Sequence, residues 1–307
     1  MRKAQAERCA VASPEFHRIR DIIASRLVHS DRPVNVEKFR ANTDSTGRAL
    51  PDSVVGDMVD ASGVPAEMQT PDEASDDNLI LYFHGGGYVG GSIASHRNLT
   101  GHLALHSGYR VLSVEYRLAP EHPHPAAVED AVASYSWAIA QGYKPENIAI
   151  AGDSAGGGLT AACLISLRDQ QLPGPAAAMM ISPWLDMGLT GESMVTNEGH
   201  DSSISSIGMP RMRELFLGNA PIDDPLASPL NANLEGLPPL LIQVGDEEVL
   251  MSDSLRFAEK ATDAGVEVEL RVWPEMFHVW HACVGLFQEA ADAIDEMVEF
   301  LGPRTQV

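Results

Sequence analysis

Cysteine and long apolar runs are scarce in this chain of 307 residues. Its three cysteines, Cys9, Cys163 and Cys283, are too few and too scattered for a disulfide framework or a zinc site, so a reducing cytoplasm is predicted. No apolar run approaches the roughly 18 residues of a membrane-spanning helix, so no membrane span is expected. Charged side chains throughout residues 1–20 leave no room for the apolar centre of a secretory signal peptide, and none is expected.

Positive charge is also scarce. The chain has 21 Lys and Arg residues against 43 Asp and Glu residues, which gives a formal net charge of -22 at pH 7. A nucleic-acid-binding protein needs a basic face to neutralise phosphates, so no nucleic-acid partner is expected. Acidity of this kind favours solubility and does not point to a substrate.

Short apolar runs alternate with stretches of helical periodicity. The runs lie at 79–83, 110–114, 147–151, 177–181, 240–244 and 266–272. Helices are predicted at 125–141, at 252–264 with its start at Ser252 or Ser254, and at 285–301. The third carries an apolar stripe: Leu286, Ala290, Ile294, Met297, Val298 and Leu301. Strands that alternate with helices predict an α/β protein with a parallel sheet covered on both faces.

Two regions interrupt this alternation. Residues 1–45 are predicted to form one or two helices before the first strand, and residues 186–222 contain no strand-like run. A long irregular segment inside a compact domain is typically a lid or an insertion. The predicted organisation is therefore a cap made of 1–45 and 186–222 over a catalytic domain made of 46–185 and 223–307.

The strongest chemical signal is the run GDSAG at 152–156, which follows one predicted strand and precedes a helix-forming stretch. In this context a sharp turn lifts the hydroxyl of Ser154 above the sheet as a nucleophile. The run HGGG at 84–87 follows another predicted strand, and its bare glycine amides can approach a developing oxyanion closely. His84 is predicted to brace that loop rather than to carry protons.

A serine nucleophile needs a base, and the base needs an orienting acid. In folds with a G-x-S-x-G turn between a strand and a helix, the chain order is nucleophile, acid, histidine. His278, just past the last predicted strand, is the preferred base, and His281 is its rival. Four carboxylates follow the predicted strand 240–244, and the residues alone do not show which of them is the orienting acid: Asp246, Glu247, Glu248 and Asp253.

Longer motifs resemble the bacterial hormone-sensitive lipase family of α/β-hydrolase esterases. The matching runs are HGGGYVGGS (84–92), YRLAPEHPHPAAVEDA (116–131), GDSAGGGL (152–159), SPWLD (182–186) and MFHVWH (276–281). The resemblance implies an α/β-hydrolase fold, with a mostly parallel eight-stranded sheet flanked by helices and a helical cap. It also implies hydrolysis of short- to medium-chain acyl esters through an acyl-enzyme intermediate, without cofactor or metal.

The resemblance also implies roles for individual residues. The family's nucleophile and histidine fall on Ser154 and His278, and its oxyanion-hole amides fall on three residues: Gly86, Gly87 and Ala155. The family's acid sits in a D-x-L-x-D-like stretch, of which Glu248-Val249-Leu250 matches the first three positions. Glu248 is therefore the expected acid. The sequence departs from the family pattern in two ways: Glu stands where Asp is commoner, and the second Asp is displaced to Asp253.

Two other functions compete with this interpretation. Residues 85–90 also satisfy the G-x-G-x-x-G pattern of dinucleotide-binding oxidoreductases, with Glu115 as a candidate ribose ligand. That function leaves the serine turn and the late histidine unexplained. The second competing function is that of a non-catalytic binding protein. The plant gibberellin receptors are of this kind: they resemble this family but lack the working histidine, whereas this chain has both Ser154 and His278. Neither Glu121-His122-Pro123-His124 nor the i, i+4 pair His102 and His106 makes a complete metal-ligand set.

Two further expectations concern the pocket and the assembly. Tyr88 and Trp184 are predicted to line the substrate pocket together with the cap. The last predicted strand, 266–272, alternates apolar and charged residues as a half-exposed strand near a sheet edge would. Edge strands invite pairing, so a homodimer through this strand is predicted.

Overall fold

The computed structural model describes residues 12–25, 27 and 34–305. Cys9 and parts of the predicted cap at 1–45 lie outside the described residues. Within the described part, no helix is both long enough and apolar enough to cross a bilayer.

The strands form one mostly parallel sheet of eight strands in the order β1-β2-β4-β3-β5-β6-β7-β8. The bounds are β1 (Val54–Asp60), β2 (Pro65–Pro71), β3 (Leu79–Phe83), β4 (Arg110–Val114), β5 (Ile148–Asp153), β6 (Ala177–Ile181), β7 (Leu240–Gly245) and β8 (Val268–Trp273). The pairs β1–β2 and β2–β4 are antiparallel, and every later pair is parallel. The carboxyl ends of β5, β6, β7 and β8 therefore meet at one edge of the sheet.

Helices cover both faces of this sheet. They are α1 (Pro14–Ala24), α2 (Val36–Asp44), α3 (Ile93–Ser107), α4 (Ala126–Ala140), α5 (Ala155–Asp169), α6 (Ser193–Thr196), α7 (Met209–Leu217), α8 (Met251–Asp263) and α9 (Gln288–Leu301). Successive side chains of a strand point to opposite faces. Leu81 of β3 accordingly packs in one core with residues of α4, α5 and α8, whereas Ile80 packs in a second core with residues of α3 and α9.

Several sequence-based boundaries are wrong by a few residues. The last strand begins at Val268 rather than 266, and α8 begins at Met251, before either predicted serine, with Leu250 as a cap that has no side-chain hydrogen bond. Helix α9 begins at Gln288, so Leu286 precedes it and is 43% exposed instead of lying on the buried stripe. The hairpin β1–β2 was absent from the predicted runs.

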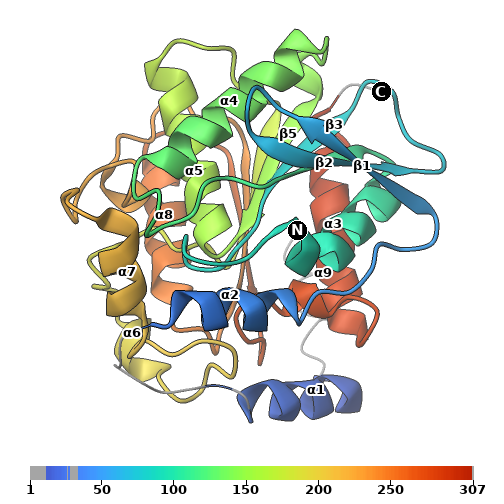
Figure 1. Cartoon of the computed structure of the whole chain (residues 1–307). Helices are drawn as coiled ribbons and strands as arrows, with labels where there is room; N and C mark the ends of the chain where they lie inside the picture. The colour runs from blue at the N-terminus through green and yellow to red at the C-terminus, as the bar shows by residue number, and fades with distance from the viewer. Residues whose placement is uncertain (1–11, 26, 28–33, 306–307) are drawn as a thin grey trace.

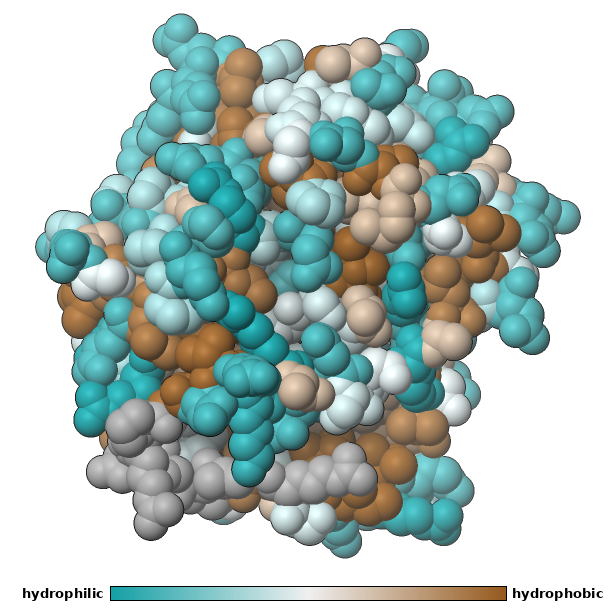
Figure 2. Space-filling view, in the orientation of Figure 1, coloured by the Kyte–Doolittle hydropathy of each residue, from teal (hydrophilic) through white to brown (hydrophobic). Residues whose placement is uncertain are grey.

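The described parts of the two regions that interrupt the alternation lie toward one end of the molecule (Figure 1). In that view α1 and α2 lie on the same side as α6 and α7, which are the helical parts of 186–222. Arg40 of α2 donates to the main-chain oxygen of Val89, and Met212 of α7 lies against Gly87, so both helices contact the loop after β3. In the same orientation, Figure 2 shows hydrophobic surface among mostly hydrophilic atoms in the region of α2 and α7.

Candidate active site

Ser154 occupies a tight turn between β5 and α5. Its backbone has φ 54° and ψ -120°, a conformation that non-glycine residues rarely adopt. The Ser154 amide donates to the main-chain oxygen of Ile181 at 2.8 Å, and its own carbonyl accepts from the Trp184 amide at 2.9 Å. A Cβ on Gly156 would lie 1.9 Å from the carbonyl oxygen of Phe83, so only glycine fits there. The turn therefore places Ser154, a partly exposed residue, at the carboxyl edge of the sheet.

His278 and Glu248 meet at the same edge. Nδ1 of His278 lies 2.9 Å from Oε2 of Glu248, and the two side chains are almost fully buried. The other oxygen of Glu248, Oε1, accepts from the Ser182 hydroxyl at 2.7 Å and from the Gly245 amide at 2.6 Å. The carboxylate is thus held by one hydroxyl and one amide while its second oxygen contacts the imidazole.

The electrostatic surroundings favour a protonatable imidazole at His278. Burial by itself lowers the pKa of His278, but the hydrogen bond and charge of Glu248, with the charges of Asp201 and Asp153, outweigh it and raise the pKa. His281, by contrast, lies on a short 3-10 turn and contacts Gln243 through Nε2 at 2.9 Å. Burial lowers the pKa of His281 to about 3, so it stays neutral and takes part in packing.

The other three carboxylates of this turn contact different groups. Asp246 accepts from the Glu275 amide at 2.7 Å, and Glu247 lines a surface cavity. Asp253, in the first turn of α8, accepts from the amides of Leu185 and Asp186 at 2.9 and 3.0 Å. Burial raises the pKa of Asp253 to about 7, although the amide of Leu185 and the ion pair with Arg256 lower it. Of the four carboxylates, Glu248 alone contacts the His278 ring.

Three main-chain amides, in the loop after β3 and at the start of α5, are the predicted oxyanion donors. Ala155 is the first residue of α5, where helical amides have no partner within the helix. In the described part of the chain, the amides of Gly86, Gly87 and Ala155 donate to no protein acceptor. Gly86 has φ +120° and Gly87 has φ +63°, so the loop depends on glycine at both positions. Amides of this kind can bind an oxyanion.

Asp153 joins the glycine loop to the serine turn. Its Oδ1 accepts from the Tyr82 hydroxyl at 2.8 Å and from the Gly85 amide at 3.0 Å, and it pairs with His96 at 3.4 Å. Burial raises the pKa of Asp153, but the charge and hydrogen bond of His96 outweigh this and lower it. Sequence reasoning missed this contact, although Asp153 occupies the variable position of the G-x-S-x-G pattern.

His84 is packed inside the protein. Its ring stacks on Tyr116 at a centroid distance of 4.3 Å, and its Nδ1 lies 2.8 Å from the Gly85 carbonyl oxygen. Burial, with a smaller contribution from His96, lowers the pKa of His84 to about 3. A neutral, stacked imidazole fits the predicted bracing role better than proton transfer.

Tyr88 and Trp184 are nearly inaccessible, each with 2% exposure. Tyr88 stacks on Phe216 of α7 at 3.7 Å and lies 6.5 Å from the ring of Trp184. These side chains therefore pack α7 against the loop after β3. Their predicted contact with a substrate stays a prediction.

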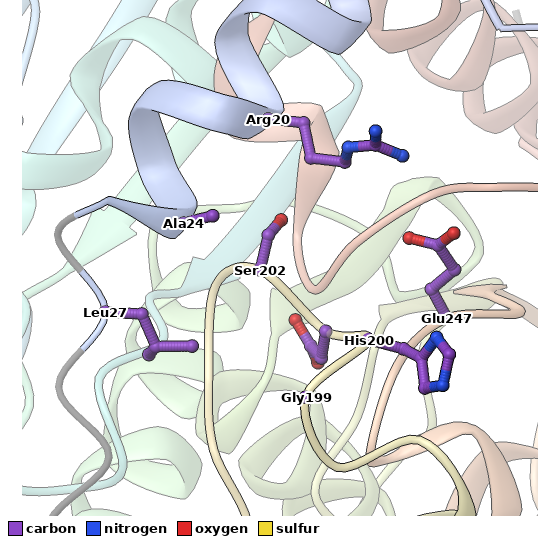
Figure 3. Close-up of a pocket in the computed structure, with 8 residues that line it drawn as sticks. Arg20, Ala24, Leu27, Gly199, His200, Ser202 and Glu247 are labelled. Atoms are coloured by element: carbon purple, nitrogen blue, oxygen red, sulfur yellow. The ribbon is translucent and has the colours of Figure 1, made fainter.

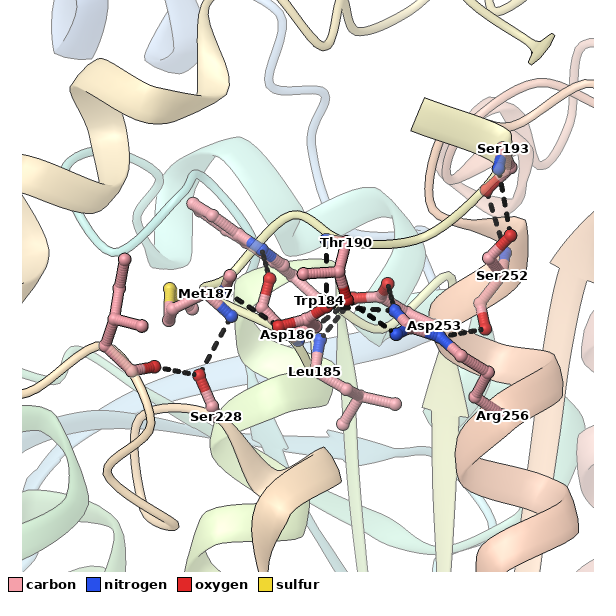
Figure 4. A network of polar contacts seen from close by, with 12 residues as sticks. Trp184, Leu185, Asp186, Met187, Thr190, Ser193, Ser228, Ser252, Asp253 and Arg256 are labelled. Carbon is pink, nitrogen blue, oxygen red and sulfur yellow. Dashed lines mark hydrogen bonds and ion pairs between the residues drawn. The ribbon is translucent and has the colours of Figure 1, made fainter. Parts of the chain in front are cut away.

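A polar network anchors the start of the 186–222 segment (Figure 4). Asp186 and Asp253 both pair with Arg256 of α8, at 3.0 and 2.9 Å. Ser193 and Ser252 exchange reciprocal hydrogen bonds of 2.9 Å, amide to hydroxyl in each direction. Because Ser252, Asp253 and Arg256 belong to α8, this network ties the segment to the helix that follows the Glu248 turn.

A cavity of about 300 Å³ opens between α1 and the turn 199–202 (Figure 3). Its lining includes Arg20, His200, Asp201 and Glu247, but not Ser154, Tyr88 or Trp184.

The structure gives other roles to the residues of the dinucleotide-binding and metal-binding alternatives. Glu115 accepts from the amide of Ile93 at the start of α3. Within the described ranges, no group of three or more His, Cys, Asp or Glu side chains could hold a metal ion.

Comparisons with known proteins agree with this fold. A family model described as the alpha/beta hydrolase fold matches residues 80–282. The chain is 42% identical to an acetyl-hydrolase of Streptomyces hygroscopicus over 96% of its own length and 98% of the relative. It is 38% identical to an esterase of Acinetobacter venetianus, over 74% of this chain and 76% of that protein.

Solved structures give the same result. An esterase of the bacterial hormone-sensitive lipase family superposes with a TM-score of 0.92 at 42% identity, covering 97% of this chain and all of that one. A crystal structure of EstE5 soaked with p-nitrophenyl butyrate gives a TM-score of 0.92 at 42% identity, over 95% of this chain and 99% of the other.

Proposed function

The chain belongs to the bacterial hormone-sensitive lipase family of α/β-hydrolase esterases and is a carboxylic-ester hydrolase; from this premise we propose that it acts through Ser154, His278 and Glu248. One observation carries the proposal. The imidazole of His278 contacts the buried carboxylate of Glu248 at 2.9 Å, at the sheet edge where the strained turn presents Ser154. These are the parts that nucleophilic acyl transfer requires.

Each residue has a defined part in the proposed reaction. Nε2 of His278 takes the proton of the Ser154 hydroxyl as its oxygen attacks the ester carbonyl, and the amides of Gly86, Gly87 and Ala155 stabilise the resulting oxyanion. Collapse of this intermediate expels the alcohol, which receives the proton from His278, and leaves an acyl group on Ser154. Water activated by the same imidazole then releases the acid and restores the hydroxyl. Glu248 fixes the imidazole orientation throughout.

We propose that 1–45 and 186–222 form a cap over this site and that its inner surface binds the acyl chain. The support comes from partly buried apolar side chains of these segments that pack beside the core: Val36, Phe39, Leu189, Ile204, Met212 and Leu215. Met212 lies against Gly87 and Phe39 against Gly90, so both reach the proposed oxyanion loop. An apolar lining favours acyl groups of some length over acetate.

A series of p-nitrophenyl esters from acetate to decanoate tests this substrate class. We expect kcat/KM to rise by roughly fourfold per methylene, since burial of each CH₂ contributes about 0.8 kcal/mol, until the pocket ends at butyrate or hexanoate. The Ser154→Ala variant supplies the rate of uncatalysed hydrolysis for each ester. A strict preference for acetate, or best activity on long-chain triglyceride emulsions, would contradict the proposal.

The position of β8 at the sheet edge supports the proposed homodimer. Val272 of β8 is 43% exposed, and its main chain faces no further strand of the described sheet. Light scattering at micromolar concentration is expected to give twice the chain mass of 33.0 kDa. Val272→Lys should shift the mass toward the monomer because it adds a charge to the pairing edge. A monomeric mass for the wild-type protein would contradict the proposed homodimer.

We also propose the cytoplasm as the compartment of this enzyme. Cys163 and Cys283 both carry free thiols. Burial raises the pKa of the Cys283 thiol to about 11, which keeps it protonated and unreactive near neutral pH. Two unpaired thiols suit a reducing environment.

A further inference from the structure

A second buried carboxylate lies beside the His278–Glu248 pair. Asp201, in the turn between α6 and α7, is only 1% exposed. Its Oδ1 accepts hydrogen bonds from the amides of Ser203 and Ile204 at 3.0 and 3.3 Å, so the side chain shapes its own turn.

The same carboxylate reaches two other loops. The Val249 amide donates to Oδ2 of Asp201 at 3.2 Å, and the His278 amide donates to Oδ1 at 3.4 Å. Val249 directly follows Glu248 in the chain. One side chain from the proposed cap is therefore hydrogen-bonded to the main chain beside the proposed acid and to that of the proposed base.

Asp201 remains buried at an energetic cost. A carboxylate that leaves water loses hydration, and amide donors replace only part of it. Burial accordingly raises the pKa of Asp201 to about 6; His278 lowers it and Glu248 raises it. An asparagine could fill the same space without a charge, so the charge itself needs a reason.

We propose that Asp201 is a positioning residue for ester hydrolysis: it clamps the Glu248 and His278 loops to the cap, and its charge helps to stabilise the imidazolium of His278. This inference rests on the proposed function, because it takes His278 as the base. A shift of the loops by about 1 Å is enough to lower the rate by roughly 100-fold.

The charges around His278 predict a pH effect. Three carboxylates face the imidazole from three elements: Glu248 after β7, Asp153 at the end of β5, and Asp201 from the turn between α6 and α7. Asp201 also lines the cavity of Figure 3, where the other charged or titratable side chains are Arg20, His200 and Glu247. Asp201 raises the pKa of His278, so its removal lowers that pKa. Because the neutral imidazole acts as base, the acid limb of the kcat/KM profile then moves to lower pH.

The experiment measures kcat and kcat/KM on one short-chain p-nitrophenyl ester across pH for two variants. Asp201→Asn is expected to lower kcat by about 10- to 100-fold and to move the acid limb to lower pH. Asp201→Glu keeps the charge but adds a methylene, so we expect a lower kcat with the acid limb near its wild-type position. A purely structural role would not separate the two variants in this way.

Glu247→Gln is the matched control. It removes a carboxylate from the same cavity wall, but Glu247 bonds to neither the Val249 nor the His278 amide, so kcat and the acid limb should stay near wild type. Wild-type kcat and acid limb in Asp201→Asn would overturn the inference, as would an equal shift in Glu247→Gln. If Asp201→Asn does not fold by circular dichroism, Asp201→Glu decides: unchanged kcat there overturns the inference. Activity in Ser154→Ala would instead overturn the proposed function.

Discussion

Ser154→Ala is expected to lower kcat by roughly 10⁴-fold or more, with the fold intact. The main chain of Ser154, rather than its hydroxyl, holds the turn: the amide donates to Ile181, and the carbonyl accepts from Gly158 and Trp184. Alanine keeps these hydrogen bonds and carries the same Cβ at φ 54°. The variant therefore removes the nucleophile and little else. The measurements are turnover of a short-chain ester and the thermal unfolding midpoint.

Ser166→Ala is a suitable control for this variant. Ser166 lies on the same helix, α5, and its hydroxyl accepts from Gln170 at 2.8 Å in the last turns, away from the sheet edge. We expect wild-type turnover after this change. Full turnover in Ser154→Ala, with an unchanged unfolding midpoint, would refute Ser154 as nucleophile.

Glu248→Gln is expected to lower kcat by roughly 10³- to 10⁴-fold with little change in KM. A glutamine has no charge to stabilise the imidazolium, and its amide group can turn toward Nδ1 and select the wrong tautomer of His278. The change also removes the hydrogen bond and charge that raise the pKa of His278, so the acid limb of kcat/KM should move to lower pH. Initial rates against substrate concentration and pH provide the test.

Three further amide substitutions complete this test: Asp246→Asn, Glu247→Gln and Asp253→Asn. We expect the first two to keep most of the activity. Asp253→Asn should mainly lower the unfolding midpoint, because Asp253 accepts from two buried amides and pairs with Arg256. The assignment of Glu248 fails if the deepest kcat loss falls on another of the four, and Asp253 would then be the next candidate.

The elements that the sequence predicted well are those with a strong local signal. Strands β3, β4 and β6 coincide with their apolar runs because all or nearly all of their residues are buried, so every position except Arg110 at the start of β4 is apolar or small. The hairpin β1–β2 has no such signal. In β1 only Val54 is buried, and the strand exists because its main chain pairs antiparallel with β2. The start of α8 was misplaced because no serine or aspartate side chain caps it.

Local sequence alone determined the serine turn, the glycine loop and the order of serine, carboxylates and histidine, because each depends on neighbouring residues and on glycine conformation. Which carboxylate meets the imidazole was decided by the tertiary structure. Asp246, Glu247 and Glu248 share one turn and Asp253 follows in the first turn of α8, and the direction of each side chain depends on its partners, such as Ser182 for Glu248. No local sequence pattern singles out Asp201, because its hydrogen bonds to the amides of Val249 and His278 span 48 and 77 residues of the chain. Hydrogen bonds between distant loops form only when the sheet brings their strand ends together.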